Sequence, residues 1–148
     1  MLYHAPVPAF DYIARDASGR RVKGRADAAS EAALLGDLEQ RGMLNETLVL
    51  FGSEFGRQPT AQGADGRDHN ITGYPMFLVG AGVKAGYTHG ASDEYGIRGV
   101  EGRMHTTDLH ATLLALMGLD HEQLTYAYAG RDFRLTDVRG AVAREIFA

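Results

Sequence analysis

The sequence predicts an α/β fold, and two kinds of pattern support that prediction. Residues 47–51 and 75–79 are short apolar runs closed by glycine, which is typical of strands that are covered on both faces of a sheet. Residues 30–41 and 106–118 instead place apolar side chains at helical spacing. We therefore expect two buried strands with flanking helices and, between the strands, one long polar loop.

The composition excludes several classes of protein. The chain has 148 residues, of which 45% are hydrophobic, enough to bury a core. Its formal net charge of -4 provides no basic surface for a nucleic-acid partner. The absence of cysteine excludes disulfides and thiolate metal sites. No apolar run approaches the roughly 18 residues that span a bilayer, and the first ten residues do not resemble a signal peptide. We therefore expect a cytoplasmic chain without a membrane span.

The N-terminal part predicts a β-hairpin followed by a helix. Residues 9–25 alternate apolar and polar side chains on either side of a turn signal at residues 16–19. This pattern predicts two paired strands, with the returning strand near residues 21–24. Ser30 then caps a helix that ends at Gly42 in a left-handed conformation.

The C-terminal part predicts a loop, two helices and a short strand region. Residues 80–104 are rich in glycine and predict a long irregular connection. Thr106 or Thr107 is the expected N-cap of the next helix, which stops at Gly118. The apolar face expected for this helix consists of Leu109, Leu113, Leu116 and Met117.

Two further elements are expected after this helix. Residues 125–136 predict a small strand with a turn at Gly130. Residues 137–147 place Val138, Ala141, Val142 and Ile146 at helical spacing, so a last helix is expected from an Asp137 cap to about Phe147.

The polar loop between the two apolar runs contains the candidate site. Ligands of open α/β sheets bind beyond the carboxyl ends of strands, and Glu54 follows the first run directly. Its carboxylate suits a divalent metal, which could be Zn, Mn, Ca or Mg. The alternative is a surface Glu54 that pairs with Arg57.

Asp68 and His69 form the second group of this loop. A histidine beside a carboxylate can bind a metal through one ring nitrogen while an acceptor orients the other. The alternative is a turn with a solvated histidine. Arg57 and Arg67 could hold an anionic small-molecule substrate through paired hydrogen bonds, although both also suit a surface.

The remaining histidines are weaker candidates. His105 precedes a helix N-terminus and is included as a candidate metal ligand, whereas His110 is expected as a core or interface residue. His4, His89 and His121 have no supporting context. No catalytic nucleophile is assigned, because no neighbouring base or motif activates Ser53.

Residues 8–44, PAFDYIARDASGRRVKGRADAASEAALLGDLEQRGML, resemble the opening of the inner-membrane platform protein of type II secretion and type IV pilus systems. The resemblance implies the same hairpin and helix. It also implies a non-enzymatic interaction module of such a platform, for which the membrane helices of that family are missing here.

Residues 34–148 resemble the C-terminal part of the DUF1501 family in the segments LVLFGSEFGRQP, GRDHN, LVGAGVKAG and TTDLHATLLALMGLDHEQLTYAYAGRDFRLTDV. That family is similar to sulfatases of the alkaline phosphatase superfamily. The resemblance implies a partial phosphatase-like sheet, a division into residues 1–33 and 34–148, and a fusion junction between them. It also implies metal ligation by Glu54 and His69, with Asp68 as a further ligand or as the residue that orients His69. Phe55 stands in place of one ligand of the related proteins.

The function expected from this resemblance is the C-terminal portion of a metal-dependent hydrolase of sulfate or phosphate esters. Weak or no activity is expected from the chain alone, because the part of the domain that bears the nucleophile is missing; intact relatives could be exported. The alternatives are the platform module and a non-functional fusion fragment. Strands without neighbours would also favour self-association through exposed sheet edges.

Overall fold

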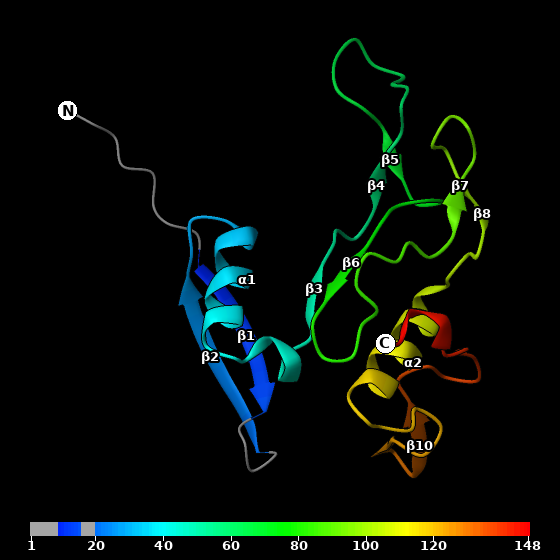
Figure 1. The fold of residues 1–148 in the computed structure, drawn as a ribbon. Helices are drawn as coiled ribbons and strands as arrows, with labels where there is room; N and C mark the ends of the chain where they lie inside the picture. Colours follow the sequence, from blue (N-terminus) through cyan, green and yellow to red (C-terminus); the bar gives the residue numbers. More distant parts are fainter. Residues whose placement is uncertain (1–8, 16–19) are drawn as a thin grey trace. The chain divides into compact units, whose positions relative to one another are not determined.

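The computed structural model describes residues 9–15 and 20–148, which form two compact units (Figure 1). Unit 1 comprises the described residues up to Val49 together with Val79–Ala81, and unit 2 comprises Leu50–Leu78 and Gly82–Ala148. Both helices and strands are present in the described part, which confirms the α/β class.

The strands of the structure, in chain order, are β1 Ala9–Arg15, β2 Arg21–Asp27, β3 Val49–Phe51, β4 Gly56–Arg57, β5 His69–Asn70, β6 Phe77–Val79, β7 Ala91–Ser92, β8 Gly99–Glu101, β9 Thr125–Tyr128 and β10 Arg131–Arg134. The α-helices are α1 Glu31–Gln40 and α2 Thr106–Leu116, and two 3-10 helices cover Leu44–Glu46 and Arg144–Ile146. Each sheet formed by the described strands has two strands: β1-β2, β3-β6, β4-β5, β7-β8 and β9-β10.

Unit 1 confirms the predicted hairpin and helix. β1 and β2 pair in antiparallel register from Ala9 opposite Asp27 to Arg15 opposite Arg21; the predicted turn at residues 16–19 lies outside the described residues. The Ser30 hydroxyl oxygen accepts a hydrogen bond from the backbone N–H of Ala33 at 3.2 Å, as expected of an N-cap. The helix is followed by Gly42 at φ 66°, in the left-handed conformation that glycine adopts without strain.

Residues 47–51 and 75–79 contain strands as predicted, but the prediction that these strands are buried was wrong. β3 and β6 lie within these ranges and pair with each other, but Leu50, Phe51 and Phe77 expose 44%, 52% and 59% of their surface. The expectation assumed further strands and helices on both faces, and within the described residues the β3-β6 sheet has no third strand. Apolar composition alone therefore did not imply burial.

The core of unit 2 lies between α2 and the C-terminal segment. Ala111 and Leu114 of α2 are buried, as are Ala143 and Ile146 near the end of the chain. The predicted apolar face of α2 was therefore partly wrong, since Met117 is 48% exposed. The C-terminal segment packs on a different side of the helix, where the fully buried Thr112 accepts a hydrogen bond from the backbone N–H of Ala143.

The predicted last helix was also wrong. Asp137, its expected cap, has φ 52°, and Gly140 has φ 107°; both lie in the left-handed region, which does not continue a right-handed helix. The backbone N–H groups of Ala141 and Ala143 donate to side chains of α2 instead of forming a helical ladder. Only the single 3-10 turn Arg144–Ile146 forms in this segment.

The predicted strand and turn at residues 125–136 are confirmed as the β9-β10 hairpin. Tyr128 pairs with Arg131, which leaves Ala129 and Gly130 as a two-residue turn. No helix in the part of the chain that the structure describes is long and apolar enough to cross a lipid bilayer.

Candidate functional site

The polar loop is carried by the short β4-β5 hairpin. The two strands are antiparallel, with Gly56 opposite Asn70 and Arg57 opposite His69. Two further backbone hydrogen bonds continue the ladder, from Gln58 N–H to the Asp68 carbonyl at 2.8 Å and from Asp68 N–H to the Thr60 carbonyl at 3.3 Å. The loop of residues 58–68 therefore closes as a hairpin extension and brings Arg57 directly across from His69.

The two faces of this hairpin differ in burial. Side chains alternate between faces along a strand, so Arg57 and His69 share one face while Asn70 lies on the other. Asn70 is 1% exposed, its amide N–H donates to the Gly96 carbonyl, and its side-chain oxygen accepts from the N–H and hydroxyl of Thr72. The buried Asn70 anchors the hairpin, which leaves the Arg57 and His69 face toward solvent.

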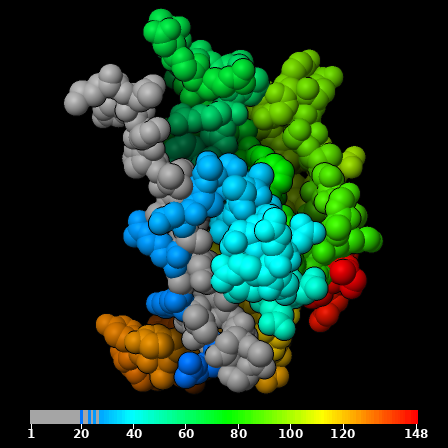
Figure 2. All heavy atoms as spheres, turned by 60° about the vertical axis from the view of Figure 1, so that its left-hand side comes forward, coloured from blue at the N-terminus to red at the C-terminus, as the bar shows by residue number. Residues whose placement is uncertain are grey.

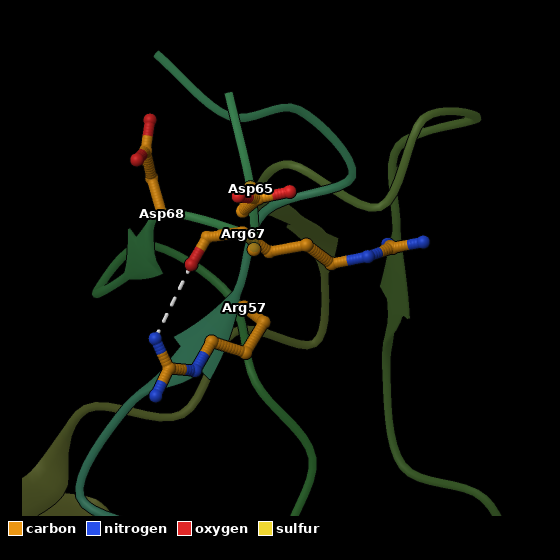
Figure 3. A pocket seen from close by; sticks show the side chains of 5 residues that line it. Arg57, Asp65, Arg67 and Asp68 are labelled. Carbon is orange, nitrogen blue, oxygen red and sulfur yellow. Dashed lines mark hydrogen bonds between the residues drawn. The ribbon is translucent and has the colours of Figure 1, made fainter. Parts of the chain in front are cut away.

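An open hollow of about 640 Å³ lies along the loop (Figure 3). Arg57 Nη1 donates to the backbone carbonyl of Arg67 at 3.2 Å, whereas Asp68 accepts the N–H of Gln62 at 3.1 Å. Figure 3 shows the guanidinium groups of Arg57 and Arg67 pointing in different directions. The two guanidinium groups could therefore bind an anion on different sides of the loop. The expectation that Arg57 and Arg67 hold one anionic substrate stays a prediction. The hollow is lined by Arg57, Asp65, Gly66, Arg67 and Asp68.

Phe55 is the residue of this site that sequence reasoning undervalued. Its ring stacks on the imidazole of His69, with 3.9 Å between ring centroids and 23° between ring planes. The guanidinium carbon of Arg57 lies 5.3 Å from the centroid of the same ring. The signal in the sequence was the spacing Phe55-x-Arg57, which in an extended chain places both side chains on one side.

Glu54 precedes the hairpin and is exposed. Its carboxylate accepts a hydrogen bond from the Ser53 hydroxyl at 3.3 Å, which is long for an O–H donor. Among the described residues Glu54 forms no ion pair with Arg57, and neither ring nitrogen of His69 has a hydrogen-bond partner. Both candidate ligands thus keep donor atoms open to solvent.

The donor atoms of this hairpin suit a divalent cation in kind but not in number. Carboxylate oxygens and an imidazole nitrogen are ordinary ligands of zinc and manganese. Within residues 9–15 and 20–148, however, no three His, Asp or Glu side chains lie close enough together to hold one ion. A structural or catalytic zinc site usually has three or four protein ligands, so the described residues alone provide an incomplete set.

His105 caps a helix, and its candidate role as a metal ligand stays a prediction. It is itself the N-cap of α2, so the assignment of Thr106 or Thr107 to that position was wrong. Its Nδ1 accepts from the Thr107 N–H at 3.2 Å, and the Asp108 carboxylate accepts from the His105 N–H at 2.9 Å. This capping box uses one ring nitrogen of His105 for the helix end.

A second hollow, of about 210 Å³, lies between α2 and the C-terminal segment. His89 Nδ1 lies 3.4 Å from the Glu145 carboxylate, and Arg103 and Asp108 line the same hollow. The backbone N–H of Ala141 lowers the pKa of Asp108 by hydrogen bonding to its carboxylate, and the His105 N–H adds to the effect. No sequence signal joined His89 to Glu145, because their contact depends on the fold of the C-terminal segment.

Of the remaining histidines discussed from the sequence, His4 lies outside the described residues. His121 is buried, and its Nδ1 lies 3.0 Å from the hydroxyl of the fully buried Thr136, so it has the partner that a buried imidazole needs. His110 is half-buried within α2.

Comparison with known proteins identifies one family. The model of the family described as "Protein of unknown function (DUF1501)" matches residues 15–147. This range includes all of β2, all of α1 and the β4-β5 hairpin. Neither a curated protein nor a solved structure gives a significant match.

Proposed function

The chain belongs to the DUF1501 family, and on that premise we propose that it is the C-terminal portion of a metal-dependent hydrolase of sulfate or phosphate esters. The observation that carries the proposal is the register of the β4-β5 hairpin, in which Arg57 lies opposite His69. A fixed guanidinium suits a tetrahedral anion, and a neighbouring imidazole with open nitrogens suits a cation. An anionic ester bound to a divalent metal needs both groups close together.

The residues of this chain have separate tasks in the proposed site. Glu54, Asp68 and His69 would contact the cation, while Arg57 and Arg67 would bind the anionic part of the substrate. The metal would supply charge stabilisation and an acidified water when bound. Because the described residues provide an incomplete ligand set, we propose weak or no hydrolysis by the chain alone.

Zinc and manganese titration of the 148-residue chain tests this proposal. A ligand that binds only the folded state raises its melting temperature, by an amount that grows with the logarithm of the ligand concentration divided by Kd. We expect stabilisation of the wild type and a loss of at least about tenfold in affinity, or 1.4 kcal/mol, in His69→Ala and Glu54→Ala. Glu94→Ala is the matched control, since Glu94 is also exposed and lies in another loop. A cooperative melt that ignores both metals would overturn the proposal.

A second candidate is the non-enzymatic module of a secretion or pilus platform. The β1-β2 hairpin with α1 supports it, since that arrangement was expected from the platform resemblance. The platform function requires no ion, so the same titration separates the two candidates. A broken fusion product would show no cooperative melt at all.

We further propose self-association through sheet edges. Each described strand pairs on one side only, and an unpaired edge offers N–H and C=O groups to a second strand. Light scattering across a range of concentrations would detect an increase in mass; a constant monomer mass would contradict this proposal.

A further inference from the structure

We infer that Phe55 is a positioning residue that holds the His69 imidazole in a single orientation on the β4-β5 hairpin. The inference rests on the proposed function, in which His69 contacts the cation. Phe55 itself has no donor atom and touches neither cation nor substrate. Its role is to act on the ring of His69 by stacking.

The register explains how the two rings meet. Arg57 is directly opposite His69. Phe55 directly precedes β4 and lies two residues before Arg57, whose guanidinium lies over the Phe55 ring, so both side chains are on the same side of the chain. Phe55 and His69 are thus diagonal neighbours, whose separation of about 7–8 Å between Cα atoms is within reach of aromatic side chains. The observed centroid distance of 3.9 Å with planes at 23° is that of a stacked pair.

The backbone beneath the two rings is held from both sides. A Cβ at Gly56 would come 2.8 Å from the Tyr74 Cβ and 2.9 Å from the Gly73 carbonyl, so β4 packs closely on that segment. On the other strand, Asp68 is fixed by its two backbone hydrogen bonds and Asn70 by its buried side chain. With the backbone held, the orientation of the His69 ring depends on its own side-chain rotation.

Phe55 is the contact that limits this rotation. His69 is exposed, and none of the described residues forms a hydrogen bond to its ring, whereas Phe55 is half-buried and covers one ring face. Stacking leaves the ring edge, where both nitrogens lie, uncovered. Phe55 therefore supplies the orientation that a hydrogen-bonded carboxylate or carbonyl gives to other metal-binding histidines.

Nuclear magnetic resonance of the full chain without metal tests the orientation directly. The wild type should show cross-relaxation between Phe55 ring protons and the carbon-bound protons of His69. Phe55→Leu should shift the His69 ring resonances by removing the ring current. Phe55→Tyr should retain both the cross-relaxation to His69 and the wild-type His69 resonances. Phe51→Leu makes the same exchange four residues earlier, next to Phe77, and should leave His69 unchanged.

Zinc calorimetry on the same variants tests the consequence for binding. Loss of an orienting contact typically weakens metal affinity by about 10–100-fold, so we expect that loss in Phe55→Leu and wild-type affinity in Phe55→Tyr and Phe51→Leu. If the wild type binds no zinc but Phe55→Leu alone moves the His69 resonances, the proposed function fails and the positioning role stands.

Two results would overturn the positioning role. One is zinc binding by Phe55→Leu at wild-type affinity with unchanged His69 resonances. The other is the absence of cross-relaxation between Phe55 and His69 in the wild type. The second result needs no variant, so the inference can be contradicted even if Phe55→Leu fails to fold.

Discussion

The hydroxyl of Thr112 joins α2 to Ala143 of the C-terminal segment. Its oxygen accepts the Ala143 N–H at 3.0 Å, while its own O–H donates to the Asp108 carbonyl at 2.7 Å. Thr112 is fully buried, so water cannot replace either bond. One side chain thus satisfies the backbone of a segment that forms no α-helix of its own.

Thr112→Val should destabilise the chain. Valine has nearly the same shape but leaves the Ala143 N–H without an acceptor, at a cost of about 1–3 kcal/mol. Urea unfolding followed by circular dichroism measures this loss. Thr112→Ser keeps both hydrogen bonds and should be the milder change; equal losses in the two variants would mean that packing, and not the hydroxyl, dominates.

Thr47→Val should instead stabilise the chain. The Thr47 hydroxyl is buried and has no hydrogen-bond partner among the described residues, and a buried polar group without a partner is costly. We expect valine to raise the free energy of unfolding by about 1 kcal/mol. The same exchange at Thr112 is the matched control. A loss of stability at Thr47 would show that its hydroxyl has a partner in solution.

The Asp108 carboxylate should make the free energy of unfolding depend on pH. It accepts the N–H groups of Ala141 and His105, which lower its pKa in the folded state, and His105 and Arg139 contribute favourable charge. A carboxyl with a lowered folded pKa stabilises the protein fully above its unfolded pKa, and this contribution is lost as pH falls through the folded pKa. We therefore expect stability to decline below about pH 4.

Asp108→Asn removes this titration. Chemical unfolding between about pH 2 and about pH 7, a range that includes the usual pKa of a carboxyl group, measures the free energy of unfolding of both proteins. The difference in this free energy between wild type and Asp108→Asn should be smaller at the acid end of the range. Asp132→Asn, on the exposed β10 strand, is the control. A difference between wild type and Asp108→Asn that is constant over this range would contradict the assignment.

Ala129→Asn should stabilise the β9-β10 hairpin. Ala129 and Gly130 have φ 51° and 78°, the left-handed pair of a two-residue turn for which Asn-Gly is preferred. Alanine is strained there, so asparagine should raise stability by up to about 1 kcal/mol. Thermal melting measures the gain, and Ala127→Asn in the adjacent strand is the control. A lower melting temperature for Ala129→Asn would argue against this turn.

Local patterns were good guides wherever neighbours in sequence decide the structure. The Ser30 cap, the left-handed Gly42 and the turn at Gly130 depend on side chains and dihedral angles within a few residues, and each was found as predicted. In the candidate loop, Arg57, Arg67 and Asp68 line one hollow, and their binding roles stay predictions.

Local patterns failed where distant segments compete for the same groups. The apolar spacing after Asp137 predicted a helix, but Asp108 and Thr112 accept the N–H groups that such a helix would use. Likewise, the apolar runs of β3 and β6 indicated burial, which requires covering layers that no local pattern supplies.

The sequence by itself determined the family, the α/β class and the choice of chemical groups in the polar loop, because these depend on residue identity and short-range periodicity. Only the tertiary structure decided that Arg57 faces His69 and that Phe55 stacks on the His69 ring. Strand register sets such contacts, since a shift of one residue would move every side chain to the opposite face.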